Sequence, residues 1–255
     1  MAATLIGAHV EQTEALAQAK ARGADIAQTF LGDPQGYKGP KIPAGIEDLA
    51  PAGIDLYIHS PYLVNVATTN NRIRIPSRKL LSQHAEAAAK LGAKGLIVHG
   101  GHVGRSDDPA VGYANWRKVF ERTEFPLPIL IENTAGGDGA MARTFDSLAR
   151  LWEQLDGFDV GFCLDTCHAH AAGEDLDGIV ERVKAITGRV DLVHANNSRD
   201  AFGSGADRHA NLATGEIDPA AIAEVIRTSG APALVETPGD GQADDIAYLK
   251  ERLAG

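Results

Sequence analysis

The chain has 255 residues, of which 44% are hydrophobic, and its formal net charge at pH 7 is −10. This length and apolar content allow a large core, while the acidic balance counts against a nucleic-acid partner without excluding one, because phosphate binding normally uses Lys and Arg. No stretch approaches the roughly 20 apolar residues of a membrane span, so we expect a cytoplasmic protein with no membrane partner.

Short β-branched runs alternate along the chain with alanine-rich amphipathic segments, a pattern typical of βα units around a parallel sheet. The runs predict strands at 4–9, 25–31, 55–60, 95–99, 128–132, 160–165, 190–195 and 232–236. The segments between them predict helices at 12–22, 77–91, 110–122, 144–155, 175–187, 218–229 and 242–253. The remaining connection, 32–54, is rich in Gly and Pro and is predicted to be mostly loop.

These elements predict an α/β fold, a TIM (β/α)8 barrel that forms a single domain over residues 1–255. No linker, repeat or low-complexity tract interrupts the pattern. A doubly wound open sheet is the competing architecture. It usually places its ligands at one switch point, whereas polar residues here end strands three to eight.

Histidines and carboxylates stand at the C-terminal ends of these strands or a few residues beyond them. In a TIM barrel such positions converge on one active site. The candidate metal ligands are His59, His99, Glu132, Asp165, His168, His194, Asp207, His209 and Glu236. They are too many for one tetrahedral zinc ion, which takes four ligands, and they suit three ions if carboxylates bridge. Closely spaced ions activate water and clamp the oxygens of a phosphodiester, so the set predicts phosphodiester hydrolysis.

The other histidines have weaker claims to an ion. His9 ends the first strand, but the second strand offers no partner at its end, so we expect His9 to support the ligands rather than bind metal. His84 and His170 are expected on a helix surface or in a loop, and His102 suits a spare ligand or a substrate contact equally well. The only two cysteines, at 163 and 167, lie too close together in sequence to favour a disulfide.

Six stretches resemble one known family in order along the chain. They are IGAHV (6–10), HSPYLVN (59–65), IENTAGG (131–137), CLDTCHAHAAG (163–173), GSGADRHANLATGEI (203–217) and ETP (236–238). These stretches resemble endonuclease IV, a family of metal-dependent apurinic/apyrimidinic (AP) endonucleases built on a xylose-isomerase-like TIM barrel. The resemblance covers nearly the whole chain.

The resemblance implies three Zn2+ ions per chain, with Mn2+ or Fe2+ as the alternative at one site. His59, His99 and Glu132 would hold the first ion. Glu132 would bridge to a second ion held by Asp165, His194 and Glu236. The third would be held by His168, Asp207 and His209. The catalytic residues would be Glu132 and Glu236, acting with a metal-bound hydroxide.

The same resemblance implies a DNA-repair activity. The enzyme would cleave the phosphodiester 5′ to an abasic site, giving a 3′-hydroxyl and a 5′-deoxyribose phosphate, and would clean blocked 3′ ends. Its partner would be double-stranded DNA with abasic sites or 3′ blocking groups, bound by a monomer in the cytoplasm and associated with the nucleoid through DNA. Tyr62 and Leu63 match the family's loop that enters DNA.

Two departures from the family pattern concern the surroundings of the metals. The loop after the second strand, 32–37, lacks the family's basic, glutamine-rich insertion. Asn197 stands where the family more often has Asp, which removes a charge near the metals; we expect Asn197 to act through hydrogen bonds to the ligands.

Two other functions compete with AP endonuclease. A sugar isomerase or epimerase of the xylose-isomerase-like type also carries His and carboxylates at strand ends, but it needs only one or two ions and has no use for a third group. A DNA- or metal-binding protein that has lost catalysis is the other alternative.

Overall fold

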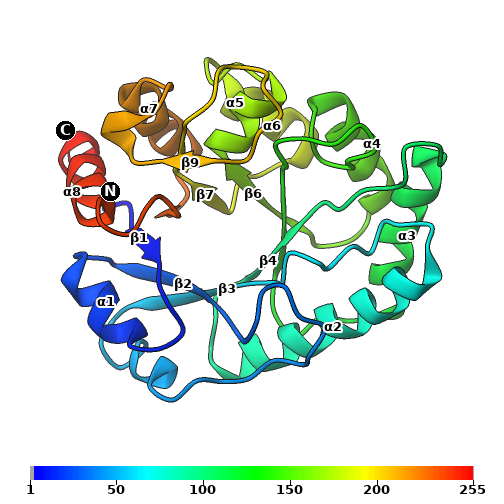
Figure 1. Cartoon of the computed structure of the whole chain (residues 1–255), viewed down its shortest axis with the longest axis horizontal. Helices are drawn as coiled ribbons and strands as arrows, with labels where there is room; N and C mark the ends of the chain where they lie inside the picture. Colours follow the sequence, from blue (N-terminus) through cyan, green and yellow to red (C-terminus); the bar gives the residue numbers. More distant parts are fainter. Residues whose placement is uncertain (1–2, 255) are drawn as a thin grey trace.

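Eight parallel strands close into a barrel in the computed structural model, which describes residues 3–254 (Figure 1). The strands are β1 (Ile6–His9), β2 (Ile26–Phe30), β3 (Asp55–His59), β4 (Leu96–His99), β5 (Ile129–Glu132), β6 (Gly161–Asp165), β7 (Leu192–His194) and β10 (Ala233–Val235). Each strand pairs with its neighbour in chain order, and β1 pairs with β10 to close the sheet. The predicted TIM barrel is therefore confirmed, and all eight predicted strands are present.

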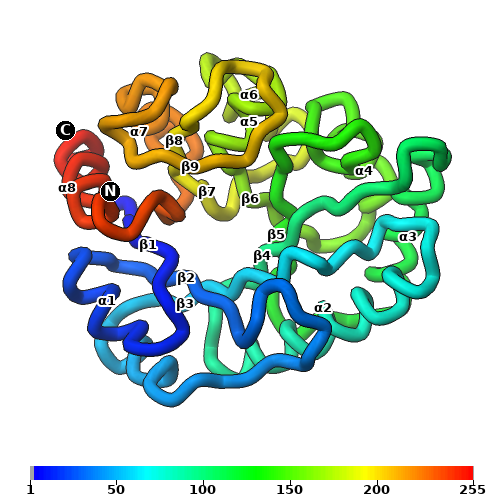
Figure 2. Tube along the Cα trace, viewed as in Figure 1, coloured from blue at the N-terminus to red at the C-terminus, as the bar shows by residue number. Residues whose placement is uncertain are grey.

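Helices surround this sheet (Figure 2). An α-helix follows every strand of the barrel except β2, whose connection to β3 holds only a 3-10 turn, and two α-helices follow β6. They are α1 (Ala15–Ala21), α2 (Asn71–Lys90), α3 (Pro109–Arg122), α4 (Phe145–Leu155), α5 (Thr166–Ala172), α6 (Ile179–Thr187), α7 (Pro219–Ser229) and α8 (Gln242–Leu253). Short 3-10 turns occupy Ile46–Asp48 and Leu212–Thr214. The last helix, α8, packs against the first strand, β1. Within the described residues, no helix combines the length and apolar character that crossing a bilayer requires.

Helix α2 begins six residues earlier than predicted, at Asn71 instead of residue 77. A start at residue 77 leaves Pro76 outside the helix, and proline lacks the N–H that a helix interior needs. In the structure Pro76 lies inside the helix, and the Asn70 side chain caps the N-terminus by accepting a hydrogen bond from the backbone N–H of Arg72. The cap at Asn70 therefore sets the start of α2.

The interior of the barrel is filled by an apolar layer to which seven strands contribute one residue each. Its members are Ile26, Tyr57, Ile97, Leu130, Cys163, Leu192 and Leu234. The eighth strand contributes Gly7, where a Cβ atom would lie 1.7 Å from the carbonyl oxygen of Ile26. Only glycine fits at this position, so the small residue lets β1 approach β2 closely.

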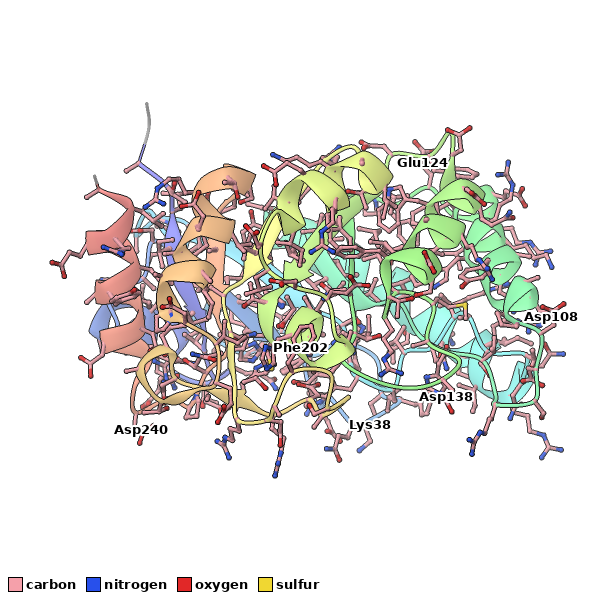
Figure 3. The ribbon with its side chains drawn as sticks, turned by 90° about the horizontal axis from the view of Figure 1, so that it is seen from above. Lys38, Asp108, Glu124, Asp138, Phe202 and Asp240 are labelled. Atoms are coloured by element: carbon pink, nitrogen blue, oxygen red, sulfur yellow. The ribbon has the colours of Figure 1, made fainter. Side chains whose placement is uncertain are left out.

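Successive side chains of a strand point to opposite faces, so the residues two positions after the apolar layer also point into the barrel. We call these eight residues the polar layer: His9, Gln28, His59, His99, Glu132, Asp165, His194 and Glu236. They lie at the C-terminal ends of the strands. The loops on this side of the barrel carry Lys38, Asp138, Phe202 and Asp240, along the lower edge of Figure 3, whereas Glu124 lies on the opposite side. The polar layer thus forms the floor of the loop-bearing end.

Candidate metal centre

Glu132 lies at the centre of the polar layer, fully buried at the end of β5. Four imidazoles surround its carboxylate. Oε2 lies 3.1 Å from His59 Nε2 and 3.4 Å from His99 Nε2. Oε1 lies 3.1 Å from His194 Nδ1 and 3.2 Å from His168 Nδ1. One carboxylate therefore faces histidines from three other strand ends and from helix α5, each oxygen serving a different pair.

A second group of ligand atoms shares Glu132 with the first. His194 Nδ1 lies 3.2 Å from Glu236 Oε2 and 3.9 Å from Asp165 Oδ2. The candidate ligand atoms of Glu132, Asp165, His194 and Glu236 all lie within 4.8 Å of one another, as do those of His59, His99 and Glu132. Because Glu132 belongs to both sets, its two oxygens are placed to serve two neighbouring sites.

Helix α5, which the sequence did not predict, positions the third group. The residues after Asp165 were expected to form a loop, but Asp165 Oδ1 accepts a hydrogen bond of 2.7 Å from the backbone N–H of His168 and so caps a helix over Thr166–Ala172. The first turn of this helix places the His168 ring beside Glu132, inside the barrel. The carboxylate Asp165 therefore both begins a helix and lies among the candidate ligands.

A two-stranded ribbon brings in the remaining residues of the third group. The strands β8 (Asn197–Ser198) and β9 (His209–Ala210) pair in antiparallel fashion and fold the loop after β7 back over the barrel. As a result, Asp207 Oδ1 lies 3.1 Å from His168 Nε2 and 3.2 Å from His209 Nε2. The candidate ligand atoms of Asp165, His168 and His209 also lie within 4.8 Å of one another. Half of the Asp207 side chain is exposed (53%), so this group opens toward solvent.

Charges within the cluster shift its pKa values in opposite directions. Burial acts to raise the pKa of Glu132, yet the surrounding imidazoles, His194 and His99 foremost, hold it well below its ordinary value. Burial likewise acts to lower the pKa of His168 and of His194, but their acidic neighbours raise both well above 6.5. The carboxylates and imidazoles of the cluster thus favour one another's charged forms.

The carboxylates at the edge of the cluster follow the same rule, with one exception. Against the effect of burial, His194 and His209 help to lower the pKa of Glu236 to about 2, and His168 and His209 hold the pKa of Asp207 below its ordinary range. In Asp165 burial prevails and raises the pKa. A fully buried carboxylate with a raised pKa needs a further positive charge to stay ionised.

The donor set fits divalent metal ions. The Nε2 atoms of His168 and His209 are buried and make no hydrogen bond to any described residue, although both lie close to Asp207. Buried polar atoms without a partner are costly, and a cation that both nitrogens face would remove that cost. Imidazole and carboxylate ligands without thiolate suit Zn2+, and also Mn2+ or Fe2+.

Two amides outside the predicted set of site residues contact the candidate ligands. Asn196 donates to Asp165 Oδ2 (2.6 Å) and to Glu236 Oε2 (3.2 Å). Gln28 donates to Glu236 Oε1 (2.6 Å). By contrast, the side chain of Asn197 hydrogen-bonds only to backbone atoms, of Leu212, Ile217 and Ser198, so the contact with the ligands that we expected of Asn197 is made by Asn196.

The remaining histidines lie outside the three groups. His9 belongs to the polar layer, where its Nδ1 lies 3.0 Å from Gln28 Nε2 and burial lowers its pKa to about 4. His84 is buried rather than on a helix surface, and its Nδ1 bonds the carbonyl of Leu80. His170 bonds the carbonyl of Asp200. His102 lines a neighbouring pocket beside Tyr62 and His99, a position that suits a substrate contact.

A cavity of about 500 Å3 opens above the cluster. Its lining residues are His59, Tyr62, His99, His168, Arg199, Asp207, His209, Glu236, Thr237 and Pro238. Tyr62 stands at the edge of this cavity with 53% of its surface exposed, its ring 5.6 Å from that of His59 and 5.8 Å from that of His99. Leu63 is partly buried and packs on the core. The cluster therefore faces a solvent-open site large enough for part of a ligand.

Known proteins resemble this chain in sequence and in fold. A family model described as a xylose isomerase-like TIM barrel matches residues 16–253. A protein named probable endonuclease 4 from Mycobacterium bovis (strain BCG / Pasteur 1173P2) is 54% identical over 248 residues, which cover 97% of this chain and 98% of the relative. A protein of the same name from Mycobacterium leprae (strain TN) is 50% identical over 251 residues, which cover 98% of this chain and all of the relative.

Solved structures show the same fold. Endonuclease IV from Thermus thermophilus superposes with a TM-score of 0.81 at 29% identity, covering 98% of this chain and 99% of that one. A D-tagatose 3-epimerase-like protein superposes with a TM-score of 0.80 at 19% identity, covering 97% of each chain. The second likeness shows the fold alone.

Proposed function

The chain belongs to the endonuclease IV family of xylose isomerase-like TIM barrels, and from this premise we propose that it hydrolyses the DNA phosphodiester 5′ to an abasic site. The products are a 3′-hydroxyl and a 5′-deoxyribose phosphate, and blocked 3′ ends are further substrates. The enzyme acts as a monomer in the cytoplasm, on nucleoid DNA. The observation that carries the proposal is the convergence of nine imidazoles and carboxylates in one cluster, six of which line the cavity above it.

The three groups of ligand atoms would hold three Zn2+ ions. His59, His99 and Glu132 form the first group, Glu132, Asp165, His194 and Glu236 the second, and His168, Asp207 and His209 the third, with Mn2+ or Fe2+ as the alternative at one of them. When bound, such ions supply Lewis-acid activation of water and of the phosphate oxygens.

Strand ends and hydrogen bonds hold the carboxylates of this site in place. Glu132 and Glu236 are the catalytic carboxylates in this proposal, because both face the cluster from strand ends that the closed barrel holds rigidly. Asn196 supports Glu236 in two ways, since its side chain donates to the carboxylate and accepts from the backbone N–H of Glu236 at 2.7 Å. Rigid placement of such charged groups is what stabilises charge in a transition state.

Cations in the loops around the cavity support a DNA substrate despite the acidic total charge. The loops that follow the strands carry Lys38, Lys41, Arg105, Arg143, Arg199 and Arg208, and the first turn of α2 adds Arg72 and Arg74. Arg199 lines the cavity itself and donates from Nε to the carbonyl of His209. Cations bind the phosphates of DNA, and bound metal ions would offset the carboxylates on the same side.

The third group separates this proposal from a sugar isomerase or epimerase. An isomerase needs one or two ions and does not need His168, Asp207 and His209 as ligands. Here the two histidines of this group both approach one oxygen of Asp207. The proposal is tested by metal analysis of the purified protein together with turnover of a duplex bearing one abasic site and of ketoses. We expect about three ions per chain and incision of the duplex. Ketose turnover without incision would favour the isomerase, and tight DNA binding without cleavage would favour a protein that has lost catalysis.

Replacing Tyr62 with Ala is expected to weaken abasic-DNA binding by about 10-fold or more, because stacking of an aromatic ring on a base contributes about 1–3 kcal/mol. The ring is exposed at the cavity edge and is the most accessible aromatic beside the cluster. Equilibrium binding to an abasic duplex measures the effect, and zinc content should not change. Tyr62→Phe serves as the control, since it keeps the ring and should keep the affinity. Equal affinity of the Ala variant would mean that Tyr62 only packs.

A further inference from the structure

Gln28 is the one member of the polar layer that is neither a histidine nor a carboxylate. It comes from β2, two residues after Ile26 of the apolar layer, and it is fully buried. Its amide meets three side chains: Nε2 lies 2.6 Å from Glu236 Oε1 and 3.0 Å from His9 Nδ1, and Oε1 lies 2.8 Å from His194 Nε2. Two of these three residues are candidate metal ligands.

The neighbours of Gln28 allow only one orientation of its amide. A carboxylate only accepts hydrogen bonds, so the atom 2.6 Å from Glu236 must be the NH2 group. The reverse orientation would place the amide oxygen against the carboxylate, with repulsion between them. The amide oxygen therefore faces His194, where it accepts and cannot donate.

This orientation determines which nitrogen of His194 carries the proton. Because Oε1 of Gln28 is an acceptor, His194 Nε2 must be the N–H donor of the 2.8 Å bond. In a neutral imidazole the other nitrogen, Nδ1, then keeps its lone pair. That nitrogen lies 3.1 Å from Glu132 Oε1 and 3.2 Å from Glu236 Oε2, on the side of the candidate metal site.

We infer that Gln28 is a positioning residue of the metal centre. Glu236 fixes the orientation of the Gln28 amide, and the amide oxygen then holds the proton of His194 on Nε2, which leaves Nδ1 of His194 available to an ion. The inference rests on the proposed metal-dependent function. Histidine ligands of metals are generally oriented by a partner on their other ring nitrogen. Gln28 provides that partner from a strand that supplies no candidate ligand of its own.

The hydrogen bonds of the Gln28 side chain show that it does more than fill volume in the barrel. An apolar side chain could fill the same volume, and burying an amide costs free energy unless its polar atoms are paired. Here the oxygen and both N–H groups have partners, and all three partners belong to the polar layer. The neighbouring residue on β2, Thr29, is equally buried but points to the other face of the strand, away from the cluster.

The first test needs no substitution. Nitrogen-15 NMR of zinc-loaded protein with labelled histidines reports which ring nitrogen of each histidine bears the proton, and the His194→Gln variant assigns the His194 signals. We expect a protonated Nε2 on His194 that exchanges slowly with solvent. A proton on Nδ1, or an Nε2 proton that exchanges freely, would overturn the inference.

The second test removes the amide while keeping the shape of the side chain. Gln28→Met is expected to lower the affinity for one of the bound zinc ions by about 10- to 100-fold in competition with a chelator, as loss of a partner of a metal-binding histidine typically does. It should also abolish the slow exchange of the His194 Nε2 proton. The matched control, Thr29→Val, also removes a buried polar group from β2 and should keep the wild-type zinc affinity.

Each outcome of these measurements decides the inference separately from the proposed function. Wild-type zinc affinity in Gln28→Met would contradict it, even if DNA incision proved correct for the wild type. Normal zinc binding and the expected His194 proton in a protein that does not cleave DNA would support it and contradict the proposed function instead. If Gln28→Met did not fold, which circular dichroism would show, the wild-type NMR result alone would decide.

Discussion

Replacing Glu132 with Gln is expected to abolish DNA incision while leaving the barrel folded. Glu132 belongs to two of the ligand groups, and its oxygens face four imidazoles. The amide keeps the shape but loses the charge and replaces one acceptor with a donor. Metal ions supply several kcal/mol of transition-state stabilisation and each 1.4 kcal/mol is tenfold in rate, so we expect kcat/KM to fall by at least about 1,000-fold.

The decisive readouts for Glu132→Gln are the incision rate on an abasic duplex and the zinc content of the same sample. Glu174→Gln is a suitable control. This substitution is chemically identical, and Glu174 bonds the Phe145 backbone and Arg182 away from the cluster. The control should retain activity. Incision by Glu132→Gln at close to the wild-type rate would mean that a shared carboxylate is not part of the mechanism.

The barrel and most of the cluster could be predicted from the sequence because both depend on local patterns. An apolar run predicts each strand, and a charged or imidazole residue at the C-terminal end of that strand lies at the C-terminal face of the barrel. Each of these residues also stands two positions after a buried one, as Glu132 does after Leu130. The period of two along a strand is enough to place both in the interior.

Other features could not be predicted because they depend on partners distant in sequence. Gln28 carries no charge, and its role appears only when β2 meets Glu236, 208 residues away in the chain. Helix α5 was not predicted because it has only seven residues and follows directly on β6, with the strand's last residue, Asp165, as its cap. The contact expected of Asn197 is made by Asn196, because the Asn197 side chain instead bonds the backbone of Leu212 and Ile217, which lie 15 and 20 residues further along the chain.

Removal of metal is expected to lower the melting temperature by an amount that grows as the pH rises. In the metal-free protein, the raised pKa values of His168, His194 and His209 stabilise the fold fully below the ordinary value of 6.5, and this contribution is lost as the pH rises through the folded-state values. The pKa of Glu236 is lowered to about 2, so its contribution to stability is fully present above about pH 4.5 and is lost as the pH falls toward 2. The histidine–carboxylate pairs therefore stabilise the metal-free protein best between about pH 4.5 and 6.5.

Metal binding has the opposite dependence, because it requires unprotonated imidazoles. An ion at 1,000 times its dissociation constant adds about 4 kcal/mol, and 1 kcal/mol shifts the melting temperature of a domain of this size by about 2–4 °C. We expect calorimetry of zinc-loaded and chelator-treated protein to differ by roughly 10 °C at pH 8, and by clearly less at pH 5.5. Return of zinc should restore the melting temperature. A difference that is the same at both pH values would show that protons and metal ions do not compete for these histidines, and the cluster would then not be the metal centre.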